Sequence, residues 1–200
     1  PSRPAGADMN QPPMAALDAL LTRQSVGAKH LAEPGPGEAD LRRMVDAALR
    51  APDHAGLVPF RFAVVRGVAR KRLAQLFEQA ARDAGKDDAE ARIDAERAQR
   101  APVTVAVIAR IDLGHTLVPS HEQWACVGGA LTNFLNAAHA LGFGGKMLSG
   151  AKVRHPAVQQ AFCESGETLV GWIALGTPVK SPSRAGSKPR ALDVLSDWPA

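Results

Sequence analysis

A short polar segment after the first predicted helix has the residue types that bind phosphate. Arg23, Gln24 and Ser25 stand in a row there, and Lys29 follows. An arginine guanidinium can donate to two phosphate oxygens at once, and a serine hydroxyl can donate to a third. Basic residues at a helix C-terminus are also ordinary partners of the helix dipole. The segment is therefore a candidate anion site that needs support from elsewhere in the chain.

Two other polar segments are compatible with the same chemistry. Near the C-terminus, four basic residues fall within eleven positions without an acid, namely Lys180, Arg184, Lys188 and Arg190. Such a run alone is more typical of a solvated loop than of a binding site. In the second segment, a helix ends at Arg50 and a polar turn follows with Asp53 and His54. The structural alternative for this turn is that Asp53 caps a short helix and His54 is exposed.

Motifs for other kinds of chemistry fail on inspection. Residues 142–146 are glycine-rich, but they lack the spacing of a P-loop, and they follow a helix rather than the strand that a dinucleotide fingerprint requires. The sequence has no GxSxG elbow, and neither of its two cysteines has a neighbouring histidine. The six histidines form no HxxxH or HExxH pair, so no metal site is expected.

The composition fits one globular domain. Of 200 residues, 46% are hydrophobic and 22% charged, which excludes a disordered chain and a coiled coil. No segment approaches 18 consecutive apolar residues, so we expect no transmembrane helix and no membrane partner. Residues 1–13 contain four prolines and no apolar core, which predicts a disordered tail rather than a signal peptide, followed by a single domain over residues 14–200. Two widely separated cysteines favour a reducing compartment, and we expect a cytoplasmic protein.

The charge favours anionic ligands only mildly. The formal net charge is +4 and the isoelectric point is about 9.5. A basic nucleic-acid-binding domain is one interpretation of these values. However, the chain has only six Phe, three Trp and no Tyr, and it contains no recognition motif. We therefore expect no nucleic-acid partner.

Hydrophobic periodicity predicts helices that alternate with strands. Helices are predicted over residues 17–21, 41–49, 73–80 and 124–138, with another beginning at Pro156. Strands are predicted over residues 62–65, 103–109 and 169–175. The segment 103–109 is apolar throughout, as in a strand covered on both faces. Together these elements indicate an α+β or α/β fold with a sheet flanked by helices.

The long helix over residues 124–138 is expected to be buried. Trp124, Val127, Leu131, Phe134, Leu135 and Ala138 lie on one side of it. Small and apolar residues continue around much of its circumference, including Gly128 and Gly129. Each glycine costs about 1 kcal/mol of helix propensity. A helix–helix contact between subunits would offset that cost, and a tight contact within the chain is the alternative.

Residues 71–100 differ from the rest of the chain. They carry 14 charges, seven of each sign, and beyond Phe77 their one large apolar residue is Ile93. Such a segment buries little apolar surface and should be among the least stable parts of the fold. One interpretation is a solvated helix pair with i,i+4 ion pairs. The other is a mobile cover over a pocket.

Four motifs in one order resemble the FMN-dependent nitroreductase family. Arg23-Gln24-Ser25 resembles its phosphate motif, and residues 51–62, APDHAGLVPFRF, resemble its Ala-Pro signature. Residues 130–150, ALTNFLNAAHALGFGGKMLSG, are similar to its long helix and the following strand. Residues 175–178, LGTP, and the basic tail complete the order. The resemblance covers roughly residues 14–198 and is closest to the compact branch of NAD(P)H nitroreductases.

This resemblance implies an α+β fold with a central mixed or antiparallel sheet, and an intertwined homodimer with FMN at the interface. The FMN-binding residues that it implies are Arg23, Gln24, Ser25, Lys29, Arg50, His54, Met147, Leu148, Ser149, Lys188 and Arg190. Arg50 and His54 would reach the flavin of the partner subunit. NADH or NADPH would be the electron donor. The implied nicotinamide contact covers Ala137, Ala138, His139, Ala140, Leu141 and Gly142.

Three features depart from the family pattern. Gln24 replaces a second basic residue and is followed by a longer loop, and Phe60 takes the usual Trp position. Met147 and Leu148 stand where close relatives look to have Trp-Arg, so a charge is missing from the pocket.

The resemblance implies a ping-pong reaction in which NAD(P)H reduces the flavin and the flavin reduces a nitroaromatic, a quinone or a similar small-molecule acceptor. The cofactor then carries the chemistry, so no catalytic acid–base pair is needed. A cation at Lys29 or Arg50 would stabilise the charge of the reduced flavin, while Arg23 and Arg190 hold the phosphate. The rival interpretation is a non-catalytic protein that stores or senses FMN or another phosphorylated ligand.

Overall fold

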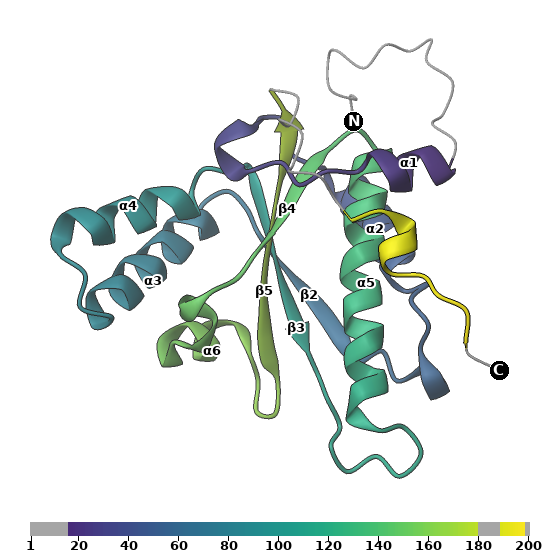
Figure 1. Ribbon diagram of the computed structural model, residues 1–200. Helices are drawn as coiled ribbons and strands as arrows, with labels where there is room; N and C mark the ends of the chain where they lie inside the picture. The colour runs from purple at the N-terminus through teal and green to yellow at the C-terminus, as the bar shows by residue number, and fades with distance from the viewer. Residues whose placement is uncertain (1–15, 180–188, 199–200) are drawn as a thin grey trace.

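The computed structural model describes residues 16–179 and 189–198, and it has a central sheet with helices on both faces (Figure 1). The predictions for residues 1–13, Lys180, Arg184 and Lys188 lie outside the described residues. The helices are α1 (Ala16–Thr22), α2 (Glu38–Ala48), α3 (Ala69–Asp83), α4 (Asp88–Ala98), α5 (Ser120–Ala140) and α6 (Pro156–Phe162). The strands are β1 (Leu31–Ala32), β2 (Phe60–Val65), β3 (Val103–Ala109), β4 (Gly144–Leu148) and β5 (Thr168–Pro178). Short 3-10 turns are η1 (Ala28–His30), η2 (His54–Gly56), η3 (Ala151–Arg154) and η4 (Ala191–Asp193).

The five-stranded sheet has the order β1-β5-β3-β2, and β4 also pairs with β5. All pairs of these strands are antiparallel. The one parallel bridge among the described residues joins Ser25 to Gly145. The predicted α+β class with an antiparallel sheet is therefore confirmed, and the intertwined dimer stays a prediction.

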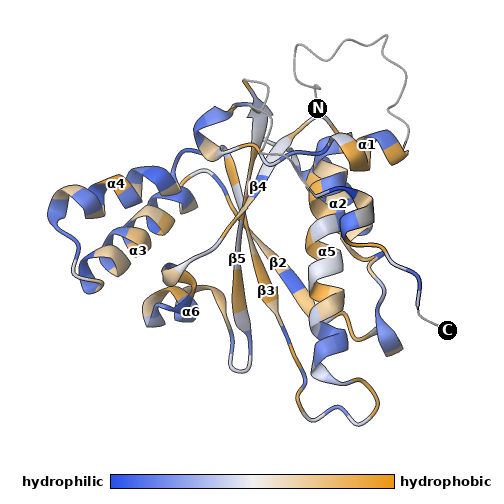
Figure 2. Ribbon diagram, in the orientation of Figure 1, coloured by the Kyte–Doolittle hydropathy of each residue, from blue (hydrophilic) through white to orange (hydrophobic). Residues whose placement is uncertain are grey.

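Strand β3 separates two layers of helices, as its continuous apolar sequence predicts. All seven of its residues are buried. Val105 and Val107 pack into a core with α2 and α5, whereas Ala106 and Ile108 pack with α3 and α6. This alternation follows from the two-residue period of a strand. Figure 2 shows apolar residues along β3 and many polar residues on α3 and α4.

Helix α5 is buried along one stripe that matches the prediction in part, since Val127, Phe134 and Ala138 are buried as predicted. The fully buried positions include Cys126, Ala130 and Phe134, whereas Trp124 is 41% exposed. A Cβ at Gly129 would lie 3.2 Å from the Ala51 side chain, so a contact within the chain explains this glycine. A Cβ at Gly128 would meet no heavy atom within 4 Å. Only one of the two glycines is therefore explained by packing within one chain.

Helix α1 also differs from its prediction. Its apolar residues Leu17, Leu20 and Leu21 are 64%, 53% and 74% exposed, while Ala19 is buried. The helix is present, but its leucine stripe has no cover within the described part of one chain. A stripe of this kind marks an interaction surface.

Residues 71–100 form the α3–α4 helix pair, which confirms that interpretation of their structure. Arg82 pairs with Glu78 one helical turn away and with Asp88 of α4. Phe77 anchors the pair, because its ring packs against Trp172 of β5 with centroids 4.9 Å apart. The mobility of this segment stays a prediction.

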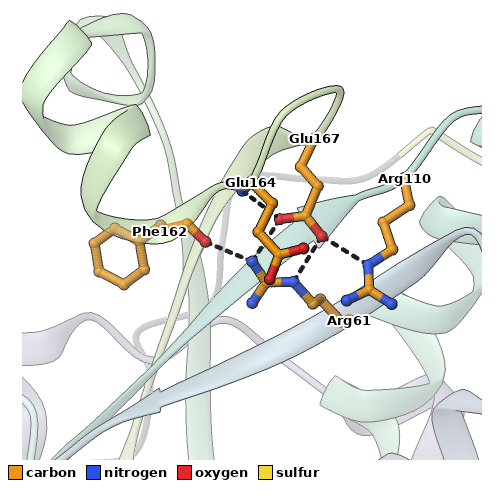
Figure 3. A network of polar contacts seen from close by, with 5 residues as sticks. All are labelled: Arg61, Arg110, Phe162, Glu164 and Glu167. Carbon is orange, nitrogen blue, oxygen red and sulfur yellow. Dashed lines mark hydrogen bonds and ion pairs between the residues drawn. The ribbon is translucent and has the colours of Figure 1, made fainter.

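A buried carboxylate ties the far end of the sheet together (Figure 3). Glu167 precedes β5, and its side chain is 6% exposed. Its carboxylate accepts hydrogen bonds from Arg61 of β2 and from Nε of Arg110 at 2.7 Å. Arg61 also donates to the carbonyl of Phe162 at 2.6 Å. The hydrogen bond from Arg61 is the largest cause that lowers the pKa of Glu167 from 4.5 to about 2.

We expect Glu167→Gln to destabilise the fold by about 3 kcal/mol at pH 7, because it leaves two arginines without their shared carboxylate. The folded pKa of Glu167 lies below its ordinary value. Its contribution is therefore complete above pH 4.5 and is lost as the pH falls through about 2. As the pH falls from 7 to 2, the free energy of unfolding measured in urea should decrease less in the variant than in the natural chain.

Glu164→Gln is the matched control, because it removes the same charge from an exposed neighbour. It should cost less than about 1 kcal/mol. Equal losses from the two variants would contradict the special role of Glu167.

Candidate functional site

The predicted phosphate motif lies beside strand β4. Helix α1 ends at Thr22, and the chain then runs next to β4, where Ser25 bridges to Gly145. The backbone N–H of Val26 donates to the carbonyl of Gly145 at 3.0 Å. Because β4 continues to Met147 and Leu148, the backbone brings two of the predicted cofactor-binding segments side by side.

The end of α5 meets the same motif. Thr22 Oγ1 lies 3.2 Å from His139 Nε2. Burial is the largest cause that lowers the pKa of His139 below 6.5, and the nearby charge of Arg23 adds to it. The predicted nicotinamide segment lies here, with Ala138 buried, Ala137, His139 and Leu141 partly buried, and Ala140 and Gly142 exposed. The structure therefore places this segment beside Arg23.

A cleft of about 760 Å³ opens between the α3–α4 pair and the segment that follows β4. Three predicted cofactor-binding residues line it, namely Lys29, Leu148 and Ser149. Phe77 and Trp172 contribute aromatic surface. Pockets of 300 to about 1,000 Å³ with mainly apolar walls are typical of cofactor and small-molecule sites. Arg23, Gln24, Ser25 and Met147 are not among the lining residues.

Gly171 of β5 sets how closely β4 can approach this wall. Its φ is 153°, and a Cβ there would lie 2.3 Å from the Leu148 carbonyl and 2.6 Å from Met147 Cε. A side chain at this position would push β4 away, so a glycine is required. Met147 packs against the core on the α2 and α5 side of the sheet, whereas Leu148 lines the cleft, because successive side chains of a strand point to opposite faces.

Buried charges join the two walls of the cleft. The carboxylate of Asp94 in α4 accepts from Lys86 Nζ at 2.7 Å and from Lys152 Nζ at 2.8 Å. Arg97 Nη1 lies 3.3 Å from the same carboxylate. Burial raises the pKa of Asp94, but the hydrogen bonds from Lys152 and Lys86 together outweigh it and lower the pKa from 3.8 to about 2. Sequence reasoning did not identify these residues, since 58 positions separate Asp94 from Lys152.

Arg50 and His54 lie elsewhere in the single chain. His54 is exposed, and its Nδ1 lies 2.7 Å from Glu122 Oε2. The carboxylate of Asp53 accepts from the backbone N–H of Leu57 at 3.1 Å and of Val58 at 2.8 Å. Asp53 therefore stands at the N-cap position of η2 and His54 is exposed, as the structural alternative predicts, but the Asp53 side chain bonds to residues beyond the turn and does not cap it. Neither Arg50 nor His54 lines the cleft, and their contact with a partner's flavin stays a prediction.

Of the C-terminal candidates, Arg190 is described and Lys188 is not. Arg190 Nη2 lies 3.0 Å from Asp193 Oδ1, and it does not line the cleft. The η4 turn that follows lies on the α5 side of the sheet in Figure 1. The role of both residues in binding phosphate stays a prediction.

The sequence pattern of the nitroreductase family matches residues 20–177. This chain belongs to the nitroreductase family. It is 40% identical over 168 residues to "Putative NAD(P)H nitroreductase YdjA" of Escherichia coli strain K12, a match that covers 82% of this chain and 89% of the relative. The family resemblance drawn from the sequence motifs is therefore confirmed.

Solved nitroreductase structures share the fold. A nitroreductase-like family protein from Bacillus cereus superposes with a TM-score of 0.80 at 18% identity, covering 94% of this chain and 98% of the other. A nitroreductase from Desulfovibrio desulfuricans, solved in complex with FMN, gives a TM-score of 0.68 at 22% identity, covering 92% and 96%. At these identities the likeness establishes the architecture alone.

Among the described residues of this nitroreductase family member, no helix is long and apolar enough to cross a membrane. The longest one, α5, has 21 residues, and polar side chains and two glycines interrupt its apolar sequence.

Proposed function

We propose that this protein is an FMN-dependent oxidoreductase that passes electrons from NADH or NADPH to a nitroaromatic, a quinone or a similar acceptor. The observation that carries the proposal is the cleft lined by Lys29, Leu148 and Ser149, together with the pairing of Ser25 to Gly145 of β4, the strand that leads to this cleft. The Escherichia coli relative is named an NAD(P)H nitroreductase, and the Desulfovibrio desulfuricans structure contains FMN.

The residues fit FMN in their chemistry. Arg23 and Ser25 supply a guanidinium and a hydroxyl for the phosphate. The cleft supplies mainly apolar walls for a flat ring system, with Leu148 next to Ser149 on the side of β4. Lys29 supplies a cation on the same wall as Leu148 and Ser149.

Bound FMN would supply hydride and electron transfer, in which the donor loses a hydride and the acceptor gains two electrons and two protons, the second proton coming from solvent. The protein itself then has to bind and orient the flavin, the electron donor and the acceptor, and to shield the flavin ring from water. Lys29 would stabilise negative charge on the reduced ring, because a fixed cation costs no reorganisation during the reaction. The α3–α4 pair forms one wall of the cleft and would exclude water from the ring.

We also propose that the active form is a homodimer. Leu17, Leu20 and Leu21 expose apolar surface on α1, and Trp124 and Gly128 do so on the outer side of α5. A second copy of the chain would cover these residues. It would also bring Arg50 and His54, which do not reach the cleft of their own chain, to the flavin of the partner.

The rival function is FMN storage or sensing without turnover, and a visible absorption spectrum with anaerobic NADPH addition separates the two. We expect flavin bands that bleach when NADPH is added. Bands that persist with both NADPH and NADH would favour the non-catalytic function. A protein that neither retains nor takes up FMN would contradict both.

We expect Arg23→Ala to weaken FMN binding at least tenfold, because a charged hydrogen bond to the phosphate contributes about 1.5–3 kcal/mol. The melting temperature of the flavin-free protein should change little, since Arg23 makes no ion pair among the described residues. Flavin fluorescence during titration with FMN measures the affinity. The matched control is Arg43→Ala, which removes an exposed cation from α2. Unchanged FMN affinity in Arg23→Ala would place the phosphate elsewhere.

Light scattering at micromolar concentration should give twice the 21.0 kDa mass of the chain. Gly128→Arg should dissociate this dimer and weaken FMN binding. In a single chain the new side chain enters open space, so the fold itself should tolerate it. Gln75→Arg adds the same charge to an exposed position on α3 and should leave the dimer intact. A monomeric natural chain that still binds FMN would contradict a site shared between subunits.

A further inference from the structure

The part of the cleft under the α3–α4 pair carries more positive charge than the proposed flavin site uses. Six basic and two acidic residues line the whole cleft. Lys29 belongs to the proposed flavin site, and three of the other five, Lys86, Arg97 and Lys152, surround the single carboxylate of Asp94. The second carboxylate, Asp83, lies 2.8 Å from His155 Nε2.

Arg100 and Arg154 are the remaining two cations of the lining. Arg100 follows α4, and Arg154 ends η3, so they come from the two opposite walls. Neither has a carboxylate partner within residues 16–179 and 189–198, and both are exposed. They are therefore available to an anionic ligand that enters the cleft.

Two aromatic residues, Phe77 and Trp172, line the same cleft. Trp172 is 3% exposed and packs edge-on against Phe77. Its indole Nε1–H is buried and has no acceptor in the described part of the chain. A buried donor without an acceptor costs about 1–3 kcal/mol, and buried polar groups are nearly always paired. The cleft thus offers the partly exposed ring of Phe77 and two guanidinium groups that have no carboxylate partner among the described residues, whereas the Trp172 N–H lies behind the cleft surface.

From these features we propose that the cleft selects aromatic acceptors that carry a carboxylate. The acceptor ring packs beside Phe77, and Arg100 and Arg154 bind the carboxylate. This selectivity rests on the proposed function, because it names the acceptor class of the same site. It adds no chemical step, and the acceptor takes up its two electrons and two protons as described above.

A phosphate on the electron donor carries similar chemistry, and it is the competing use of the two arginines. If Arg100 and Arg154 bound the extra phosphate of NADPH, their removal would lower the preference for NADPH over NADH. Under the present proposal, their removal leaves the donor preference unchanged and lowers the preference for charged acceptors.

The test compares 4-nitrobenzoate with the neutral 4-nitrobenzamide as ligands of the purified protein, by isothermal titration calorimetry in the flavin-loaded state. The double variant Arg100→Gln/Arg154→Gln should bind 4-nitrobenzoate about fivefold more weakly and 4-nitrobenzamide within twofold of the natural protein. Arg72→Gln is the control, because it removes an exposed cation of α3 that does not line the cleft.

Steady-state kinetics with the two acceptors and both nicotinamide donors complete the test. We expect the ratio of kcat/KM for 4-nitrobenzoate to that for 4-nitrobenzamide to fall about fivefold in the double variant alone. Equal loss for both acceptors, or a changed NADPH to NADH ratio with unchanged acceptor selectivity, would overturn the proposal. Calorimetry needs no turnover, so an inactive protein that still distinguishes the two ligands through Arg100 and Arg154 would overturn the proposed function and leave the charge selectivity standing.

Discussion

The candidate site depends on the pairing of β5 with β1, β3 and β4. A buried strand must satisfy its backbone hydrogen bonds with neighbouring strands, because no water reaches it. β5 does so on both edges and thereby fixes β4, which carries Met147 and Leu148. The approach of β4 is close because position 171 is glycine. The position of the cleft wall is therefore a consequence of backbone pairing rather than of any side chain with a chemical role.

Buried ion pairs stabilise two parts of the fold, the α3–α4 pair and the end of the sheet near Glu167. The α3–α4 pair buries few large apolar residues. Its buried Asp94 accepts hydrogen bonds from Lys86, in the turn between the two helices, and from Lys152 of η3. At the other end of the sheet, Glu167 joins β2 and β3 to the start of β5. Both carboxylates are nearly inaccessible to solvent, and each is compensated by two or more cations. Unpaired, either charge would carry a large desolvation cost.

The family motifs and the geometry agree only in part on which residues form the site. Lys29, Leu148 and Ser149 come together in one cleft, and Ser25 pairs with Gly145 of β4 outside it. Arg50 and His54 lie outside that cleft, and no other described part of the chain covers the exposed apolar residues on α1 and α5. Both findings have one explanation in the proposed dimer. A single polypeptide can place only half of the residues of a site that two subunits share.

The sequence by itself determined the family, the class of fold and most of the helices and strands. Continuous apolar residues are sufficient to predict β3, and the spacing of Leu41 and Met44 is sufficient to predict α2, because local periodicity reports which residues share a face. It does not report what covers that face. The tertiary structure decided the exposure of Trp124 and of the α1 leucines and the contact of Lys152 with Asp94. It also buried the Trp172 N–H without an acceptor among the described residues. Each of these features depends on which distant segments of the chain pack together. The local sequence carries no signal for that packing.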